Sequence, residues 1–161
     1  MAAARGLTSA ILSTFTAGDG ENLALYDWPL HRSHPRGMVL LVHGLGEHMG
    51  RYEKLAGRLS AWGFAVRGYD QYGHGESGGP RGGLSSATRL LDDLGDIVDD
   101  TQASLNRRKM PGTPLILLGH SLGGLVAARF VSLKLRPLEG LVLSSPALDA
   151  GLSGLQKFLV A

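Results

Sequence analysis

The chain has 161 residues, of which 43% are hydrophobic and 19% are charged, and its formal net charge is +2. This composition is ordinary for one globular domain with a hydrophobic core. Because the chain has no cysteine, disulfides, thiol catalysis and thiolate metal sites are excluded.

No stretch reaches the roughly 18 apolar residues of a membrane span. Polar residues between Thr8 and Thr14 interrupt the N-terminal segment, so a signal peptide is not expected and a cytoplasmic location is the default. The basic triplet Arg107-Arg108-Lys109 is expected at the exposed end of a helix, where cations suit the helix dipole. A lone triplet is weak evidence for nucleic-acid binding, and no nucleic-acid partner is predicted.

The first half of the chain predicts a hairpin, two strands and a helix between them. The β-type runs Ile11 to Thr16 and Leu23 to Leu30 flank a glycine-containing turn, which is typical of an antiparallel hairpin. The apolar run Met38 to Val42 suits a strand covered on both faces. Residues 52–62 have helical spacing, with Leu55, Leu59 and Trp62 on one side and Gly63 as a stop, and Phe64 to Tyr69 follows as a strand.

After a glycine-rich loop at 73–83, a long amphipathic helix is predicted from Ser86 to Arg107. Its apolar residues are expected to face the core and its acidic residues to form a solvated face, not a metal site. The inward set is Leu90, Leu91, Leu94, Ile97 and Val98, and the outward set is Asp92, Asp93, Asp96, Asp99 and Asp100. The strand Pro114 to Leu118, the helix Leu122 to Lys134 and the strand Gly140 to Leu143 follow.

This alternation of strand and helix predicts a mostly parallel sheet with helices on both faces, after an N-terminal antiparallel hairpin. Such sheets place ligand chemistry at the carboxyl ends of their strands. Glycine-rich turns follow Val42, Tyr69 and Leu118, so all three are expected at that edge. Residues 1–161 are predicted to form a single α/β domain.

The segment Gly119-His120-Ser121-Leu122-Gly123 lies between a predicted strand and a predicted helix, which is typical of a nucleophile elbow. Its glycines let the strand and the helix pass closely, and Gly124 adds clearance. Ser121 is therefore the candidate catalytic nucleophile. The alternative is a structural glycine-rich turn with an incidental serine.

The turn His43-Gly44-Leu45-Gly46 can aim a backbone N–H at a substrate carbonyl. The N–H groups of Leu45 and Leu122 are the predicted oxyanion hole. His43 is expected to hold this loop and not to act in the chemistry.

Other motifs predict no cofactor. Residues 73–78 match Gly-x-Gly-x-x-Gly, but proline and further glycines follow in place of the helix that dinucleotide binding requires. The six histidines lack metal-ligand spacing. His120 belongs to the tight turn and is not expected to take the Ser121 proton. His48 and His74 are interpreted as loop-packing residues, with a place in the pocket as the alternative.

Together, these motifs resemble the monoacylglycerol lipase and lysophospholipase group of the α/β-hydrolase fold. The resemblance runs from the first strand to Asp149 and rests on His43 to His48, Arg51-Tyr52, Asp70 to Ser77, Gly119 to Gly124 and Ser145 to Leu148. It implies a carboxylic-ester hydrolase that acts on a monoacyl lipid through an acyl-enzyme on Ser121. It also implies no metal or organic cofactor, no obligate partner, and transient membrane-surface contact through a cap.

The chain departs from this group in length. Its members are roughly twice as long, and their acid and base come after a cap that follows the sixth strand. No histidine follows His120 here, and Asp149 stands where the cap would begin. The chain therefore resembles the N-terminal part of such an enzyme, without the cap and C-terminal strands, and residues 151–161 would start the cap.

We expect the polypeptide to be inactive on its own, because it lacks the triad histidine and acid. We also expect it to be prone to aggregation through an exposed sheet edge. Two alternatives remain open. One is a non-catalytic binding module on the hydrolase fold. The other is an acyltransferase or a peptidase on the same scaffold.

Overall fold

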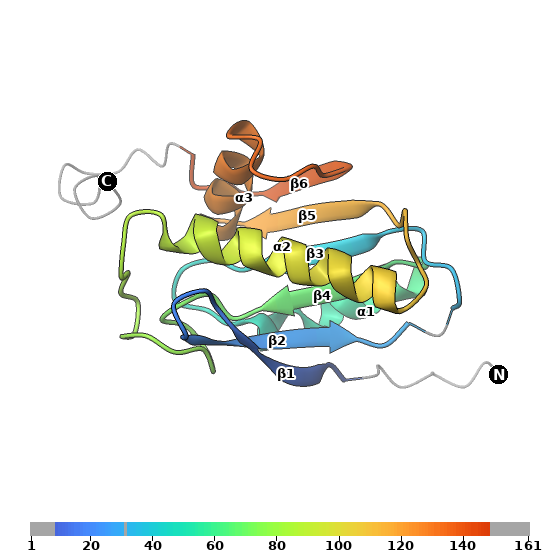
Figure 1. Ribbon diagram of the computed structural model, residues 1–161, viewed down its shortest axis with the longest axis horizontal. Helices are drawn as coiled ribbons and strands as arrows, with labels where there is room; N and C mark the ends of the chain where they lie inside the picture. Colours follow the sequence, from blue (N-terminus) through green and yellow to red (C-terminus); the bar gives the residue numbers. More distant parts are fainter. Residues whose placement is uncertain (1–8, 31, 149–161) are drawn as a thin grey trace.

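The computed structural model describes residues 9–30 and 32–148, and a six-stranded sheet runs through them (Figure 1). The strand order is β1-β2-β4-β3-β5-β6. Strands β3, β4, β5 and β6 are parallel to one another, whereas β1 and β2 pair antiparallel. Their bounds are β1 (Ile11–Thr16), β2 (Asn22–Trp28), β3 (Met38–Val42), β4 (Ala65–Tyr69), β5 (Leu115–His120) and β6 (Gly140–Ser144).

The predicted N-terminal hairpin is confirmed. Its register runs from Ile11 opposite Asp27 to Thr16 opposite Asn22, and Gly20 takes a φ of 89° in the turn. Positive φ favours glycine, so this residue permits the tight reversal. The hairpin then joins the parallel strands because β2 also pairs antiparallel with β4.

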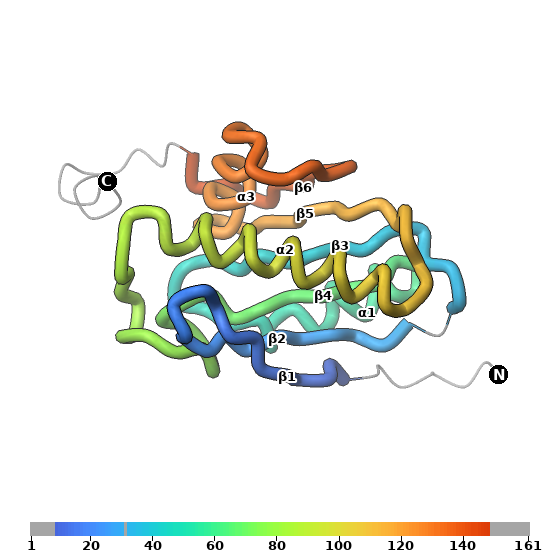
Figure 2. The backbone as a smooth tube through the Cα atoms, in the orientation of Figure 1, coloured from blue at the N-terminus to red at the C-terminus, as the bar shows by residue number. Residues whose placement is uncertain are grey.

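Helices cover both faces of the sheet, as predicted. On one face lie α2 (Arg89–Arg107) and α3 (Leu122–Ser132), and on the other lies α1 (Glu53–Ala61) after the short 3-10 helix η1 (Met49–Tyr52). The backbone trace shows α2 crossing one face of the sheet, with α1 behind it (Figure 2). The result is a three-layer α/β architecture.

The central strand β3 shows why the apolar run predicts this arrangement. All five of its residues are buried. Met38, Leu40 and Val42 belong to the core under α2 and α3, while Val39 and Leu41 belong to the core under α1. Successive side chains of a strand point to opposite faces, so a strand between two helical layers needs apolar residues throughout.

The solvated acidic face predicted for α2 was wrong at two positions. Asp93 is buried and bonded to Arg89 at 2.8 Å, and Asp100 lies 2.8 Å from the guanidinium of Arg67. Arg67 projects from β4 and also holds Asp27 of β2 at 2.8 Å. Cations that arrive from the sheet and from the first turn of α2 thus draw these carboxylates inward, because buried charges need partners.

The helix predicted over residues 52–62 also differs from expectation. Its last core residue was expected to be Trp62, but this side chain is 58% exposed, and α1 ends at Ala61. Gly63 follows with a φ of 91°, as a helix stop should. Elsewhere the differences are in the bounds: α2 begins at Arg89, not at Ser86, and β5 continues through Gly119 and His120.

Strand β6 forms one edge of the sheet and has no outer neighbour among the described strands. Its apolar residues Val142 and Leu143 are exposed, the former at 47%. The segment 151–161 and Asp149 lie outside the described residues. Within the described part of the chain, no helix is long and apolar enough to cross a bilayer.

The core contact of α2 can be tested at Ile97, which is fully buried against the sheet. We expect Ile97→Ala to lower the free energy of unfolding by about 2–5 kcal/mol, because it leaves a cavity. The exposed neighbour Gln102 provides the control, since Gln102→Ala should change it by less than about 0.5 kcal/mol. Urea denaturation measures both values, and equal effects would contradict the packing described.

Candidate active site

Three loops meet at the carboxyl ends of the parallel strands, on the left of the sheet in Figure 1. They follow β3, β4 and β5, as the glycine-rich turns predict. Contacts between them are close. A β-carbon on Gly44 would lie 3.3 Å from that of Ser121, and the Gln71 N–H donates to His43 at 2.9 Å.

Ser121 occupies a strained turn between β5 and α3. Its φ of 53° and ψ of −117° lie in a region that non-glycine residues seldom adopt. Its N–H donates to the carbonyl of Ser144 at 3.0 Å, and its own carbonyl accepts the N–H of Ala147 at 3.1 Å. The backbone of Ser121 is thus held from two sides by β6 and the residues that follow it.

The glycines around Ser121 are required by close backbone approach. A β-carbon on Gly119 would overlap the carbonyl of Gly123, and one on Gly123 would overlap the carbonyl oxygens of Val42 and His43. A β-carbon on Gly124 would lie 2.9 Å from Pro146. The predicted strand–turn–helix is therefore present, with the expected crowding between strand and helix.

The two predicted oxyanion donors lie on either side of this turn. Leu122 is the first residue of α3, so its N–H has no helical acceptor. Leu45 lies in the turn after β3, next to Gly44, which packs against Ser121. The roles of the Leu45 and Leu122 N–H groups, and of Ser121 as nucleophile, stay predictions.

His43 is fully buried and bonded at both ring nitrogens. Its Nδ1 lies 2.7 Å from the carbonyl of Gly44 and carries the hydrogen, while Nε2 accepts the Gln71 N–H. The Gln71 side chain returns a bond to the His43 carbonyl at 2.7 Å. Burial lowers the pKa of His43, so the ring stays neutral and holds the loop, as predicted.

The other histidines of this region point elsewhere. His120 lies at the end of β5, where its Nδ1 is 3.1 Å from the carbonyl and 3.0 Å from the hydroxyl of Ser144. His74 is buried, with its ring centre 5.2 Å from that of His43, and His48 is exposed. Among the described residues, no histidine is hydrogen-bonded to the Ser121 hydroxyl.

A small cavity of about 280 Å³ lies between the loops after β3 and β4. Leu45, Glu47, His74 and Arg81 contribute to its lining. Burial raises the pKa of Glu47, but the nearby Tyr52 hydroxyl and Gly44 backbone favour the charged carboxylate, and the net pKa is lowered. Across residues 9–30 and 32–148, no three metal-ligating side chains are grouped to hold a metal ion.

Asp70 has a larger part in this region than its sequence position predicts. Its buried carboxylate bonds to the backbone of both loops and to Tyr26. The sequence offers one signal, since Asp70 directly follows the apolar strand β4. That signal does not identify the donors, because two of them come from distant segments, β2 and the segment after β3.

Comparison with known proteins now identifies the family. The family model described as "Serine aminopeptidase, S33" matches residues 33–161. The chain belongs to this α/β-hydrolase family. The resemblance and the fold class predicted from the sequence are thereby confirmed.

Two relatives and one solved structure show how far the likeness extends. Monoacylglycerol lipase from Mycolicibacterium smegmatis is 36% identical over 145 residues, which are 90% of this chain and 50% of that protein. Human monoglyceride lipase is 36% identical over 128 residues, covering 80% of this chain and 40% of that protein. The solved structure is a soluble variant of Saccharomyces cerevisiae monoglyceride lipase in complex with a substrate analog, which is 27% identical to this chain with a TM-score of 0.77. The match covers 88% of this chain and 46% of the yeast chain. This α/β-hydrolase chain thus spans about half the length of the curated relatives it matches.

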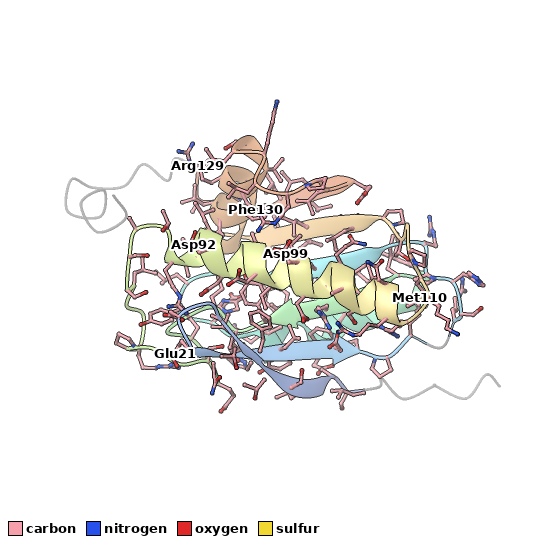
Figure 3. The ribbon with its side chains drawn as sticks, viewed as in Figure 1. Glu21, Asp92, Asp99, Met110, Arg129 and Phe130 are labelled. Atoms are coloured by element: carbon pink, nitrogen blue, oxygen red, sulfur yellow. The ribbon has the colours of Figure 1, made fainter. Side chains whose placement is uncertain are left out.

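Two glycine-to-alanine substitutions are predicted to change the free energy of unfolding in opposite directions, because only one of the glycines lies where α3 closely approaches β3. Gly123→Ala should lower the free energy of unfolding by about 3 kcal/mol or more, because the new β-carbon meets two fixed carbonyl oxygens. In α2, a β-carbon on Gly95 would meet its nearest atoms at 3.7 Å, an ordinary contact with Arg136 and with Phe130 of α3. The side chain of Phe130 is labelled in Figure 3. Gly95→Ala should therefore raise the free energy of unfolding by about 0.5–1 kcal/mol. Urea denaturation of both variants checks the signs, and a neutral Gly123→Ala would contradict the backbone contact.

The neutral His43 predicts a pH dependence of stability. Its pKa is lowered in the folded protein from about 6.5, so its stabilising contribution is complete above that pH and is lost as the pH falls through the unfolded pKa. We expect the free energy of unfolding to fall between pH 7.5 and pH 5.5, and to fall less in His43→Gln. Urea denaturation at both pH values measures this difference. The same pH dependence in both proteins would show that His43 is not held neutral.

Proposed function

We propose that this chain carries the nucleophilic half of a serine hydrolase that cleaves monoacyl lipid esters. The observation that supports this most is the strained Ser121 turn, set between the loop of Gly44 and the first turn of α3. A backbone held at this conformation costs free energy, and a turn that served only to connect β5 with α3 would have no need of it.

In the proposed reaction, the Ser121 hydroxyl oxygen attacks the ester carbonyl carbon and its proton passes to a histidine. The N–H groups of Leu45 and Leu122 donate to the oxyanion that forms. The same histidine then protonates the leaving alcohol, and water releases the fatty acid from the acyl-enzyme. This route uses no metal and no organic cofactor.

The proposal assigns the general base to polypeptide outside these 161 residues. His43 is engaged at both ring nitrogens, and the Nδ1 of His120 lies against Ser144. Without a base, Ser121 is a weak nucleophile, and the isolated chain retains only residual reactivity. The exposed strand β6 offers an edge on which further polypeptide could pair.

The proposed substrates are monoacylglycerols and related monoacyl lipids. Support comes from the two relatives named as monoacylglycerol and monoglyceride lipases, which are 36% identical to this chain. The family description names an aminopeptidase instead, which keeps a peptidase as the second candidate. The Ser121 turn does not by itself distinguish an ester from a peptide substrate, so substrate assays must decide between the two candidates.

A chimera tests the proposal directly. It joins this chain to the part of the Mycolicibacterium smegmatis lipase that lies outside the matched 50% of that protein. We expect the chimera to hydrolyse monoacylglycerol and p-nitrophenyl butyrate, and Ser121→Ala to reduce kcat roughly 10⁴-fold or more. The 161-residue chain alone should show no rapid turnover.

Four results would each contradict part of this proposal. Rapid ester turnover by the 161-residue chain would refute the missing base. Full activity in the Ser121→Ala chimera would refute the nucleophile. Cleavage of aminoacyl substrates in preference to lipid esters would favour the peptidase, and a folded chimera without any activity would favour a binding module.

A further inference from the structure

The buried carboxylate of Asp70 joins three parts of the fold. Its Oδ1 accepts the N–H of Met49 at 2.7 Å, and its Oδ2 accepts the N–H of Glu76 at 2.9 Å and the hydroxyl of Tyr26 at 3.1 Å. Met49 ends the loop after β3, Glu76 lies in the loop after β4, and Tyr26 belongs to β2. Asp70 is fully buried, so these bonds are shielded from competing water.

The chemistry of this site requires a carboxylate. Among the ion pairs of the described residues, none includes Asp70, and its three donors are neutral groups. Burying a charge without a cation is costly, so stability alone would be served better by an apolar side chain. An ionised carboxylate accepts on both oxygens, whereas an amide presents one acceptor and turns a donor toward the other N–H. Burial and the charge of Asp70 raise the pKa of Tyr26 to about 12, which keeps its hydroxyl a donor.

Packing leaves the carboxylate no freedom to move. A β-carbon on Gly75 would overlap the Asp70 carboxyl group, and one on Gly68 would overlap the side chain of Met49. Met49 is therefore held twice, through its N–H by Asp70 directly after β4 and through its side chain, which packs on Gly68 of β4. Ser77 connects the loop after β4 to β2 as well, because its hydroxyl donates to the Asp70 carbonyl at 2.5 Å and accepts the N–H of Ala24 at 2.8 Å.

These contacts continue to Ser121 through the loop of residues 43–49. Asp70 holds the last residue of this loop, and Gln71, the next residue along the chain, holds His43 at its start. Between these two ends lies Gly44, where a β-carbon would be 3.3 Å from that of Ser121. Two consecutive residues after β4 thus fix both ends of the segment that carries the proposed oxyanion donor Leu45.

We propose that Asp70 is a positioning residue that sets the loop of residues 43–49 against Ser121. The chemical consequence of this positioning, a Leu45 N–H placed to donate to the oxyanion, rests on the proposed function. Its structural consequence stands alone: without the carboxylate, the loops after β3 and β4 lose their common anchor and loosen together.

The test uses the 161-residue chain and two matched substitutions, Asp70→Asn and Asp27→Asn. Asp27 provides the control because it is bonded to Arg67, which keeps Asp100 and Thr101 as partners when Asp27 is altered. Hydrogen exchange read by mass spectrometry follows peptides that cover residues 43–49 and 71–77. Labelling of Ser121 by a fluorophosphonate is fitted to a reversible affinity, KI, and a chemical rate, kinact.

We expect Asp70→Asn to speed exchange in both peptides about tenfold, because their shared hydrogen bonds are lost. We also expect kinact to fall roughly 10- to 100-fold with KI little changed, since oxyanion donors act on the chemical step. Asp27→Asn should leave both readouts within about twofold of the unaltered chain, even if it lowers stability equally. Tyr26→Phe, which retains both backbone bonds, should lower kinact by less than Asp70→Asn and serves in its place if that variant does not fold.

Two results would overturn the inference. One is a hydrogen-exchange result: faster exchange in only one of the two peptides in Asp70→Asn, or equally faster exchange in both peptides in Asp27→Asn. The other is a loss of kinact in Asp27→Asn as large as in Asp70→Asn. If the unaltered chain takes no label at Ser121, the missing general base accounts for this, and the labelling is done on the chimera. A folded chimera that also takes no label at Ser121 would refute the proposed function, and hydrogen exchange alone would then decide whether Asp70 anchors the loops.

Discussion

The candidate site depends on how closely the first turn of α3 approaches the end of β3. At Gly123 there is no space for a β-carbon, because the carbonyl oxygens of Val42 and His43 occupy its place. This approach brings Gly44 against Ser121 and forces Ser121 into the left-handed region. A strained residue persists only where its surroundings determine it fully. Here the surroundings do so, since the N–H and the carbonyl of Ser121 are both bonded to the segment at the end of β6.

The loops around this contact are held by buried polar groups, and that choice has an energetic cost. Buried polar groups destabilise a fold where they are left unbonded, and those that are bonded make the local structure rigid. His43 meets this condition as a neutral ring that donates to Gly44 and accepts from Gln71. Asp70 meets it with three neutral donors. Apolar packing would stabilise the domain more cheaply, but it could not fix the direction of a peptide N–H beside Ser121.

Local patterns account for what the sequence could predict. The hairpin, the alternation of strand and helix, and the glycines around Ser121 each depend on residues that are close together in the chain, and all are present in the structure. The inward turn of Asp100 could not be predicted this way, because Arg67 draws it inward and the place of Arg67 on the sheet follows only from the strand order. Asp93 pairs with Arg89 one helical turn earlier, a local i, i+4 pair that the expectation of a solvated acidic face missed. As for Asp100, the contacts of Asp70 could not be predicted locally, since two of its three donors, Tyr26 and Met49, come from sequence-distant segments.

The central claim is that the backbone at Leu45 and Leu122 is already arranged for an oxyanion beside Ser121. The most direct test is a crystal structure of the chain, or of its chimera, after reaction with a fluorophosphonate. We predict a covalent bond to the Ser121 oxygen, with the phosphoryl oxygen about 2.7–3.1 Å from both backbone nitrogens. A phosphoryl oxygen that points to solvent, or an adduct on another residue, would contradict the account.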